Sequence, residues 1–215
     1  MTKINNRCLI FSAAPIHNYN KIVQVIDLHK DYIICADAGY LHAKNMDIIP
    51  NMVLGDFDSY TQPIDFEINV VRYSSEKDDT DTMIAIKLAL EKGFSDICLI
   101  GAIGGEDAHS YANIQAMNYI VNRGSTVVCY ANNAIFRVIK DSHVVLTKEQ
   151  GKYLSVFSYS DSSDGVSVQG AKYKLHDALL TNDFPLGVSN EIIENTARVC
   201  VKRGTLLIIT SEDSL

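Results

Sequence analysis

The sequence has no apolar stretch long enough to cross a bilayer, and it carries few cysteines. The apolar run Cys8–Ala14 follows the polar segment Met1–Asn6 and is too short for a signal-peptide core with a cleavage site behind it. The five cysteines are odd in number, widely spaced and set mostly in apolar segments. This pattern indicates small core residues in a reducing compartment, and neither a disulfide framework nor a zinc site. We therefore expect a soluble, cytoplasmic protein without membrane association.

An excess of basic residues is also missing. The chain has 19 Lys and Arg against 26 Asp and Glu, which gives a formal net charge of −7 at pH 7. This balance argues against a nucleic-acid partner, because such proteins need a basic face to meet phosphates. It does not exclude an anionic substrate, since carboxylates can hold a metal ion that in turn holds phosphate. With 215 residues, 47% of them hydrophobic, the chain is long enough for one large or two small domains.

Residues 1–130 alternate short, continuously apolar runs with longer amphipathic ones. This alternation predicts an α/β domain whose parallel sheet is covered on both faces. A helix is expected from Thr80–Asp81 to Gly93, because an acidic first turn and a glycine just past the end are common helix boundaries. A second helix is expected over Ser110–Asn122. The expected strands are Cys8–Phe11, Tyr32–Ala36, Met52–Leu54, Val70–Tyr73, Ile97–Ile100 and Thr126–Tyr130.

Residues 131–215 have a different texture, with short apolar or alternating runs separated by Asp, Ser, Gly and Asn. No long helical pattern occurs there, so we expect an antiparallel all-β sandwich or barrel. The segment Ser158–Gly165 is expected to be a loop, and Arg203–Gly204 a hairpin turn. The expected strands are Ile135–Ile139, His143–Leu146, Tyr153–Phe157, Gly165–Val168, Arg198–Val201 and Thr205–Ile209.

Acidic clusters follow three of the strands expected in the first domain. They are ADAG (36–39), GDFDS (55–59) and KDDTD (77–81). Because ligands bind outside the carboxyl ends of the strands in open α/β sheets, the three clusters are expected to share one crevice. Carboxylates gathered in one cleft need a counter-charge, which Mg²⁺ supplies. Asp56 and Asp58 would point the same way from extended backbone, and Thr80 and Asp81 open a helix whose free N–H groups favour anions.

Each cluster also has an ordinary structural explanation. Asp37 alone could form an Asx-turn, an Asp-X-Asp in a loop is often a turn, and residues 78–81 could simply cap a helix. The functional interpretation depends on the three clusters following successive strands.

Glycines of the segment GAIGG (101–105) follow another expected strand and precede a helix with His109 and Asn113. Glycine there would let backbone N–H groups approach a phosphate. Alone, the segment could be a tight β-to-α turn and His109 a capping or packing residue. It is neither a Gly-Lys-Ser/Thr phosphate loop nor a Gly-X-Gly-X-X-Gly fingerprint.

Taken in order, these segments resemble the thiamine pyrophosphokinase family from about residue 8 to residue 210. The resemblance rests on CADAG (35–39), GDFDS (55–59), KDDTD (77–81), GAIGG with the later His and Asn (101–113), G-x4-GAKYKL (165–175) and GVSN (187–190). It implies a Rossmann-like, three-layer α/β domain with a parallel sheet for ATP and metal at residues 1–130. A β-sandwich that binds thiamine would follow at residues 131–215. By composition alone, the last two segments would be turns at a sheet end.

The resemblance implies an enzyme that transfers the diphosphate group of ATP to the hydroxyl of thiamine, with AMP as the leaving group and Mg²⁺ as the cofactor. It also implies a homodimer whose active site lies between the α/β domain of one subunit and the sandwich of the other. The implied metal ligands and catalytic residues are Asp56, Asp58 and Asp81, the thiamine contacts are Lys77, Ser189 and Asn190, and the ATP contacts are Asp37, Gly39, Lys77, Asp78, Thr80, Gly104, Gly105, His109 and Asn113.

The sequence departs from the family where members usually have Gly-Gly-Arg-X-Asp-His. Glu106 stands in place of the Arg and Ala108 in place of the Asp, which puts an anion where a phosphate-facing cation is expected. Arg72, Arg123 and Arg137 are candidate replacements whose positions the sequence does not fix. The departure keeps two alternatives open, a non-catalytic relative that binds thiamine or a nucleotide, and another Mg²⁺-dependent phosphotransferase acting on a different small alcohol. A purely structural interaction module would leave the acidic clusters unexplained.

Overall fold

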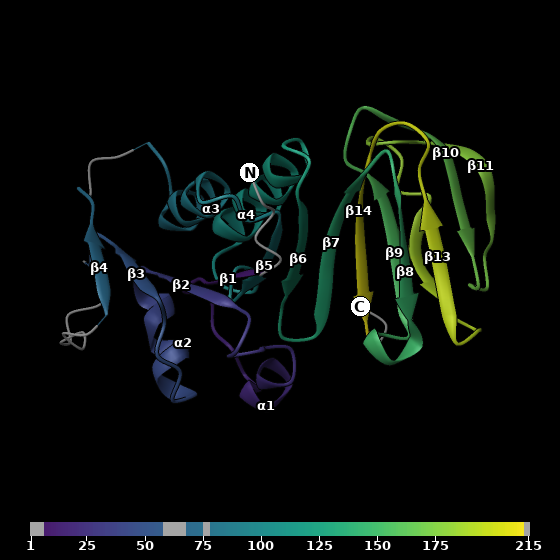
Figure 1. Cartoon of the computed structure of the whole chain (residues 1–215). Helices are drawn as coiled ribbons and strands as arrows, with labels where there is room; N and C mark the ends of the chain where they lie inside the picture. Colours follow the sequence, from purple (N-terminus) through teal and green to yellow (C-terminus); the bar gives the residue numbers. More distant parts are fainter. Residues whose placement is uncertain (1–6, 58–67, 75–77, 213–215) are drawn as a thin grey trace. The chain divides into compact units, whose positions relative to one another are not determined.

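Two compact units make up the chain, Met1–Asn132 and Asn133–Leu215, which we call the α/β unit and the sandwich unit. The computed structural model describes residues 7–57, 68–74 and 78–212 (Figure 1). No helix in this described part is long and apolar enough to cross a membrane.

The α/β unit contains a parallel sheet in the order β4-β3-β2-β1-β5-β6. The order runs in one direction from β1 to β4 and in the other from β5 to β6, so it reverses between β1 and β5. In doubly wound sheets such a reversal is where ligands bind. The strands are β1 (Cys8–Phe11), β2 (Tyr32–Ala36), β3 (Met52–Gly55), β4 (Asn69–Arg72), β5 (Asp96–Ile100) and β6 (Thr126–Tyr130). All six were expected, each to within one residue at either end.

Helices cover both faces of this sheet, with α1 and α2 on one side and α3 and α4 on the other (Figure 1). Ile22 of α1 and Ala43 of α2 pack in one core cluster with Leu9 and Phe11 of β1. Thr80 caps α3, since its Oγ1 accepts a hydrogen bond from the N–H of Met83 at 3.2 Å. The helices are α1 (Tyr19–Val23), α2 (Tyr40–Asn45), α3 (Asp81–Glu91) and α4 (Asp107–Val121), together with the 3₁₀ turns η1 (Asp37–Gly39) and η2 (Lys148–Gln150).

Two four-stranded antiparallel sheets form the sandwich unit, in the orders β12-β9-β14-β7 and β11-β10-β13-β8. Leu154 and Ile208 from the first sheet share a core with Val166 and Val199 from the second. The strands are β7 (Ala134–Lys140), β8 (His143–Thr147), β9 (Tyr153–Ser158), β10 (Ser162–Gln169), β11 (Leu175–Thr181), β12 (Gly187–Glu191), β13 (Thr196–Cys200) and β14 (Thr205–Ser211).

Several expectations for these elements were wrong. Helix α4 starts at Asp107, three residues before the expected Ser110. Strand β10 starts at Ser162, inside the expected loop, because the hydroxyl of Ser163 is buried and donates to the carbonyl of Thr205 at 3.0 Å. Arg203–Gly204 does not close a hairpin, since β13 and β14 belong to different sheets. Strands β11 and β12 were not predicted.

The cysteines are core residues, as expected. Four of the five are buried, Cys200 is half-buried, and all five are free thiols. Burial raises the pKa of Cys98 to about 12, so its thiol stays protonated near neutral pH.

Arg7 ties the start of β1 to the segment that precedes β2. Its Nε donates to Asp31 Oδ1 at 3.0 Å, and its Nη2 donates to Asp31 Oδ2 at 2.6 Å and to the carbonyl of Val25 at 2.6 Å. The Asp31 side chain is 3% exposed, and the carboxylate raises the pKa of Arg7 further above its usual range. A buried two-pronged ion pair of this kind is strongly coupled to folding.

Asp31→Asn should therefore lower the free energy of unfolding by roughly 2–3 kcal/mol, because it leaves a partly buried guanidinium without its counter-charge. Urea titration followed by circular dichroism measures the loss. Asp27→Asn is the matched control, since Asp27 pairs with Lys30 at 3.0 Å on the exposed surface. Equal effects in the two variants would contradict the role assigned to the Arg7–Asp31 pair.

Candidate active site

Close backbone contacts bring the ends of β1, β2 and β3 together. A Cβ at Gly39 would lie 2.2 Å from the carbonyl oxygen of Phe11, and a Cβ at Gly55 would lie 3.1 Å from the Cα of Asp37. Only glycine permits the first of these approaches without displacement of backbone. Asp37 is buried and has a left-handed backbone (φ 48°). The acidic turns after β2 and β3 are therefore in contact, as their positions at the carboxyl edge predicted.

The start of α3 reaches the same edge. The hydroxyls of Ser12, just after β1, and Thr82, in the first turn of α3, are buried and hydrogen-bonded at 2.9 Å. The N–H of Ser12 donates to the carbonyl of Ile100 at the end of β5, at 2.8 Å. Asp81 is the first residue of α3, and the hydroxyl of the capping Thr80 keeps its hydrogen for donation. No sequence pattern indicated that Ser12 and Thr82 make this connection.

The expected metal ligands are only partly within the described residues. Asp56 follows β3 and is half-buried, and Asp81 is also described, whereas Asp58 and Lys77 lie outside the described residues. Within residues 7–57, 68–74 and 78–212, no three His, Cys, Asp or Glu side chains are close enough to hold a metal ion together. Mg²⁺ usually takes one or two carboxylates, with water and phosphate as the other ligands. The oxygen donors of Asp56 and Asp81 fit that chemistry.

The glycine segment 101–105 packs against the loop after β1. The N–H of Ala14 donates to the carbonyl of Gly101 at 2.8 Å, and a Cβ at Gly105 would lie 3.2 Å from the Cβ of Ala14. The N–H of Gly104, an expected phosphate contact, lies 3.2 Å from the hydroxyl oxygen of Ser110. Asn113 is buried, and its amide donates to the carbonyl of Ala102 at 2.7 Å. The amide of Asn113 therefore holds this segment in place.

Charged residues near α4 lie on the surface. His109 is exposed, and its Nε2 lies 3.7 Å from the carboxylate of Glu106, which is exposed too. The structure also places the three arginines that the sequence left open. Arg72 pairs with Gly55 at the end of β4, and its guanidinium lies 4.6 Å from the ring centroid of Phe57. Arg123 stacks on Tyr119 near the far end of α4, and Arg137 is buried in the sandwich unit. Of the two candidates in the α/β unit, Arg72 and Arg123, only Arg72 lies at the acidic edge.

A cavity of about 360 Å³ lies along α3. Its lining residues are Tyr73, Asp78, Asp79, Ile84, Lys87, Leu88 and Glu91. Ile84 and Leu88 belong to a different stripe of α3 from the buried Thr82 and Ala85. Asp78 therefore borders a cavity on the flank of the helix, while Asp79 forms an ion pair with Lys87 at 2.6 Å.

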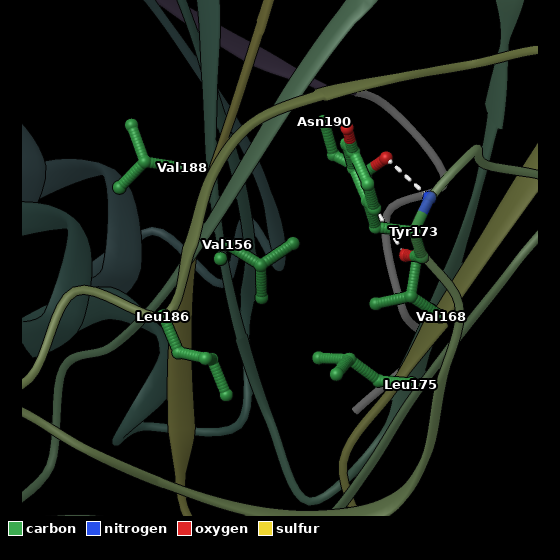
Figure 2. A pocket seen from close by; sticks show the side chains of 8 residues that line it. Val156, Val168, Tyr173, Leu175, Leu186, Val188 and Asn190 are labelled. Carbon is green, nitrogen blue, oxygen red and sulfur yellow. Dashed lines mark hydrogen bonds between the residues drawn. The ribbon is translucent and has the colours of Figure 1, made fainter.

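The sandwich unit has its own pocket, of about 80 Å³ (Figure 2). The lining residues are Val156, Val168, Tyr173, Leu175, Leu186, Gly187, Val188 and Asn190. A Cβ at Gly187 would lie 2.3 Å from the carbonyl oxygen of Val156, so the wall is closely packed there. The sequence marked the segments 165–175 and 187–191, but it did not reveal the apolar wall from β9, since alternating valines are typical of any sandwich core.

The two expected thiamine contacts have different surroundings. Ser189 lies at a bulge in the pairing of β12 with β9, has a left-handed backbone (φ 55°), and exposes its side chain. Asn190 is buried, and its amide makes two hydrogen bonds to the backbone of Tyr173, drawn as dashed lines in Figure 2. A bulge re-aims a side chain, and strained backbone is common at ligand sites. Ser189 therefore remains accessible to a ligand, whereas the amide of Asn190 is largely occupied.

Comparison with known proteins gives a consistent result. The family model described as "Thiamin pyrophosphokinase, catalytic domain" matches residues 24–129, and the one described as "Thiamin pyrophosphokinase, vitamin B1 binding domain" matches residues 142–206. The thiamine pyrophosphokinase of Bacillus subtilis (strain 168) is 28% identical over 186 residues, which cover 84% of this chain and 87% of that protein.

Solved structures of such proteins have the same fold. The crystal structure of thiamine pyrophosphokinase from Bacillus subtilis matches with a TM-score of 0.86 and 25% identity, over 97% of this chain and all of that one. The corresponding protein from Geobacillus thermodenitrificans matches with a TM-score of 0.84 and 23% identity, over 97% of this chain and 98% of that one. At 23% identity the second match supports the fold alone.

A buried histidine supports the loop after β1. Nε2 of His42 lies 3.0 Å from the carbonyl oxygen of Ala14, and Nδ1 lies 2.9 Å from the hydroxyl of Tyr19. Because a carbonyl only accepts, Nε2 carries the hydrogen and Nδ1 accepts from Tyr19. Burial lowers the pKa of His42, and the hydrogen bond to Ala14 opposes this shift. His42 is therefore neutral in the folded protein near pH 7.

Since the folded-state pKa of His42 lies below the unfolded value of 6.5, the unfolded chain binds the proton first as the pH falls. The stabilisation is complete above that value and is lost progressively below it, by at most about 1.4 kcal/mol per pH unit. We expect wild-type stability to fall more steeply than that of His42→Gln between pH 7 and pH 5 in urea titrations. The matched control is His29→Gln at an exposed histidine, and parallel curves for wild type and His42→Gln would contradict the prediction.

Proposed function

The chain belongs to the thiamine pyrophosphokinase family, and we propose that it transfers the diphosphate group of ATP to the hydroxyl of thiamine. In this reaction the thiamine oxygen forms a bond to the β-phosphorus, the bond from that phosphorus to the α–β bridging oxygen breaks, AMP leaves with the bridging oxygen, and the hydroxyl proton is released. The observation that carries the proposal is the convergence of Asp37, Gly55–Asp56 and the start of α3 at one sheet edge.

The residues at this edge suit phosphate chemistry. Asp56, Asp58 and Asp81 would hold Mg²⁺, which when bound neutralises charge on the phosphate oxygens. The hydroxyl of Thr80 and the positive end of the α3 dipole would favour an anion, and Lys77 would add a cation. Such transfer depends on positioning and charge neutralisation, so no covalent nucleophile is needed.

The remaining ATP contacts would come from neighbouring segments of a doubly wound, nucleotide-binding sheet. Asp37 and Gly39 follow β2 and would border the metal, while Gly104 and Gly105 in the turn after β5 and His109 in α4 would border the phosphates. Asn113 would act by holding that turn, and Asp78 from the cavity on the flank of α3. Arg72 brings positive charge to the end of β4, next to the turn after β3.

The pocket of the sandwich unit suits one ring of thiamine. Its walls are mostly apolar, which would suit the methylated aminopyrimidine ring. The exposed hydroxyl of Ser189 would meet a polar atom of the substrate, and Asn190 lies at the pocket wall.

We also infer a homodimer in the cytoplasm. Apolar side chains at the pocket remain exposed in the single chain, with exposed fractions of 64% for Tyr173, 52% for Leu186 and 48% for Val188. A second copy would cover such a patch. The free thiols fit a reducing compartment.

Purified protein with ATP, Mg²⁺ and thiamine should produce AMP and thiamine diphosphate in equal amounts, measured by chromatography. EDTA should stop the reaction, and excess Mg²⁺ should restore it. Turnover of pyridoxal or riboflavin in preference to thiamine would instead indicate a phosphotransferase with another substrate. Absence of product while thiamine still binds in calorimetry would overturn the proposed activity and favour the non-catalytic relative.

Asp56→Asn and Asp81→Asn should each lower kcat by at least about a hundredfold, because a neutral amide cannot replace a carboxylate toward the metal and its phosphates. The melting temperature should change little. Asp96→Asn is the matched control, since Asp96 lies at the amino end of β5 on the opposite edge of the sheet. A kcat near the wild-type value in both variants would show that Asp56 and Asp81 do not belong to the active site.

A further inference from the structure

We infer that Asn190 is a positioning residue, whose amide fixes the loop that carries Tyr173 and thereby sets one wall of the thiamine pocket. The inference rests on the proposed function, and it replaces a direct contact between Asn190 and thiamine.

The hydrogen bonds of Asn190 support this role. Its Oδ1 accepts from the N–H of Tyr173 at 2.9 Å and from the N–H of Glu191 at 2.9 Å, and its Nδ2 donates to the carbonyl of Tyr173 at 2.6 Å. An amide oxygen has two lone pairs and an amide nitrogen has two hydrogens. Both acceptor positions are therefore occupied, and a single hydrogen is left for any ligand. With 8% of its surface exposed, Asn190 has little area to offer a substrate.

The segment held by Asn190 is the one that forms the pocket wall. The N–H of Lys172 donates to the carbonyl of Glu191 at 2.8 Å, and Ala171 forms an isolated bridge with Ile192, so the chain before Tyr173 is tied to the end of β12. At Tyr173 the attachment is made by the side chain of Asn190, which is hydrogen-bonded to both the N–H and the carbonyl of Tyr173 (Figure 2).

The ring of Tyr173 depends on this backbone anchor for its position. Tyr173 is 64% exposed and still lines the pocket, so packing restrains it weakly. Without the hydrogen bonds from Asn190, the ring of Tyr173 could move away from the pocket. Rigid aromatic walls increase affinity because little ordering remains to be done on binding.

A double-mutant cycle distinguishes positioning from direct contact. Asn190→Ala and Tyr173→Ala should each weaken thiamine binding by about tenfold in calorimetry, and the double variant should be no weaker than the weaker of the two single variants. The KM for thiamine should rise in parallel, while the KM for ATP stays near wild type. Losses that multiply in the double variant would show that Asn190 acts independently of Tyr173 and would overturn the inference.

Two further measurements address the loop itself. Trypsin should cut after Lys172 or Lys174 faster in Asn190→Ala than in wild type, and Asn182→Ala, at an exposed asparagine of the same unit, should leave cleavage and thiamine affinity unchanged. Should Asn190→Ala fail to fold, Asn190→Asp keeps both accepted bonds but turns a carboxylate oxygen toward the Tyr173 carbonyl, which repels it, so the same loss of thiamine affinity is expected. A lower melting temperature with unchanged affinity would mean a purely structural role and would also overturn the inference.

Wild-type activity separates this inference from the proposed function. If the wild-type protein makes thiamine diphosphate but the losses of affinity multiply in the double variant, only the role inferred for Asn190 is wrong. A wild-type protein that neither binds thiamine nor makes product removes the proposed function and this inference with it.

Discussion

The carboxyl ends of parallel strands must all lie at one edge of their sheet, and the candidate site depends on this constraint. In the α/β unit the chain leaves β1, β2 and β3 at that edge, so residues that are distant in the sequence meet there. The meeting is close because glycine stands at the contact points. At Gly39 the chain passes so near the carbonyl of Phe11 that a methyl group would have no room. The buried hydroxyl pair Ser12–Thr82 then fixes where α3 begins.

This arrangement explains how an acidic site can remain folded. Carboxylates that crowd one edge repel each other, and the cost rises when they are buried. The chain offsets part of this cost with backbone dipoles at the start of α3, and Arg72 adds a cation at the neighbouring strand end. A bound cation would offset more. A cation that binds such an edge in the folded chain alone would therefore stabilise the fold.

The fold could be predicted from the sequence where burial is continuous. Four of the six parallel strands, β1, β2, β3 and β5, are short apolar runs that are buried along nearly their whole length, and such runs are visible without any partner. Strands β11 and β12 escaped prediction because they are edge strands without a buried apolar run, and both have irregular pairing at a bulge. The wrong start of α4 has a local cause, since Glu106 begins the helix without a side-chain cap. The convergence of Asp37 with Gly55 was expected because both residues stand at the carboxyl ends of parallel strands. The Ser12–Thr82 contact could not be predicted, because either residue alone is an ordinary hydroxyl.

Residues of one sequence motif can have different roles in the folded chain. Asn113 and Asn190 both stand in segments that suggest ligand binding, yet the amide of each is hydrogen-bonded to the backbone of a neighbouring segment. A side chain with most of its hydrogen-bonding capacity occupied in the folded chain has little left for a substrate. Ser189 is the opposite case, because strained backbone turns an exposed hydroxyl outward at the same bulge. Neighbours in one motif can therefore divide the work, with one residue holding the wall of the pocket and the next meeting the ligand. The sequence motif does not distinguish these two roles. They differ in how many donors and acceptors of each side chain are already hydrogen-bonded within the folded chain.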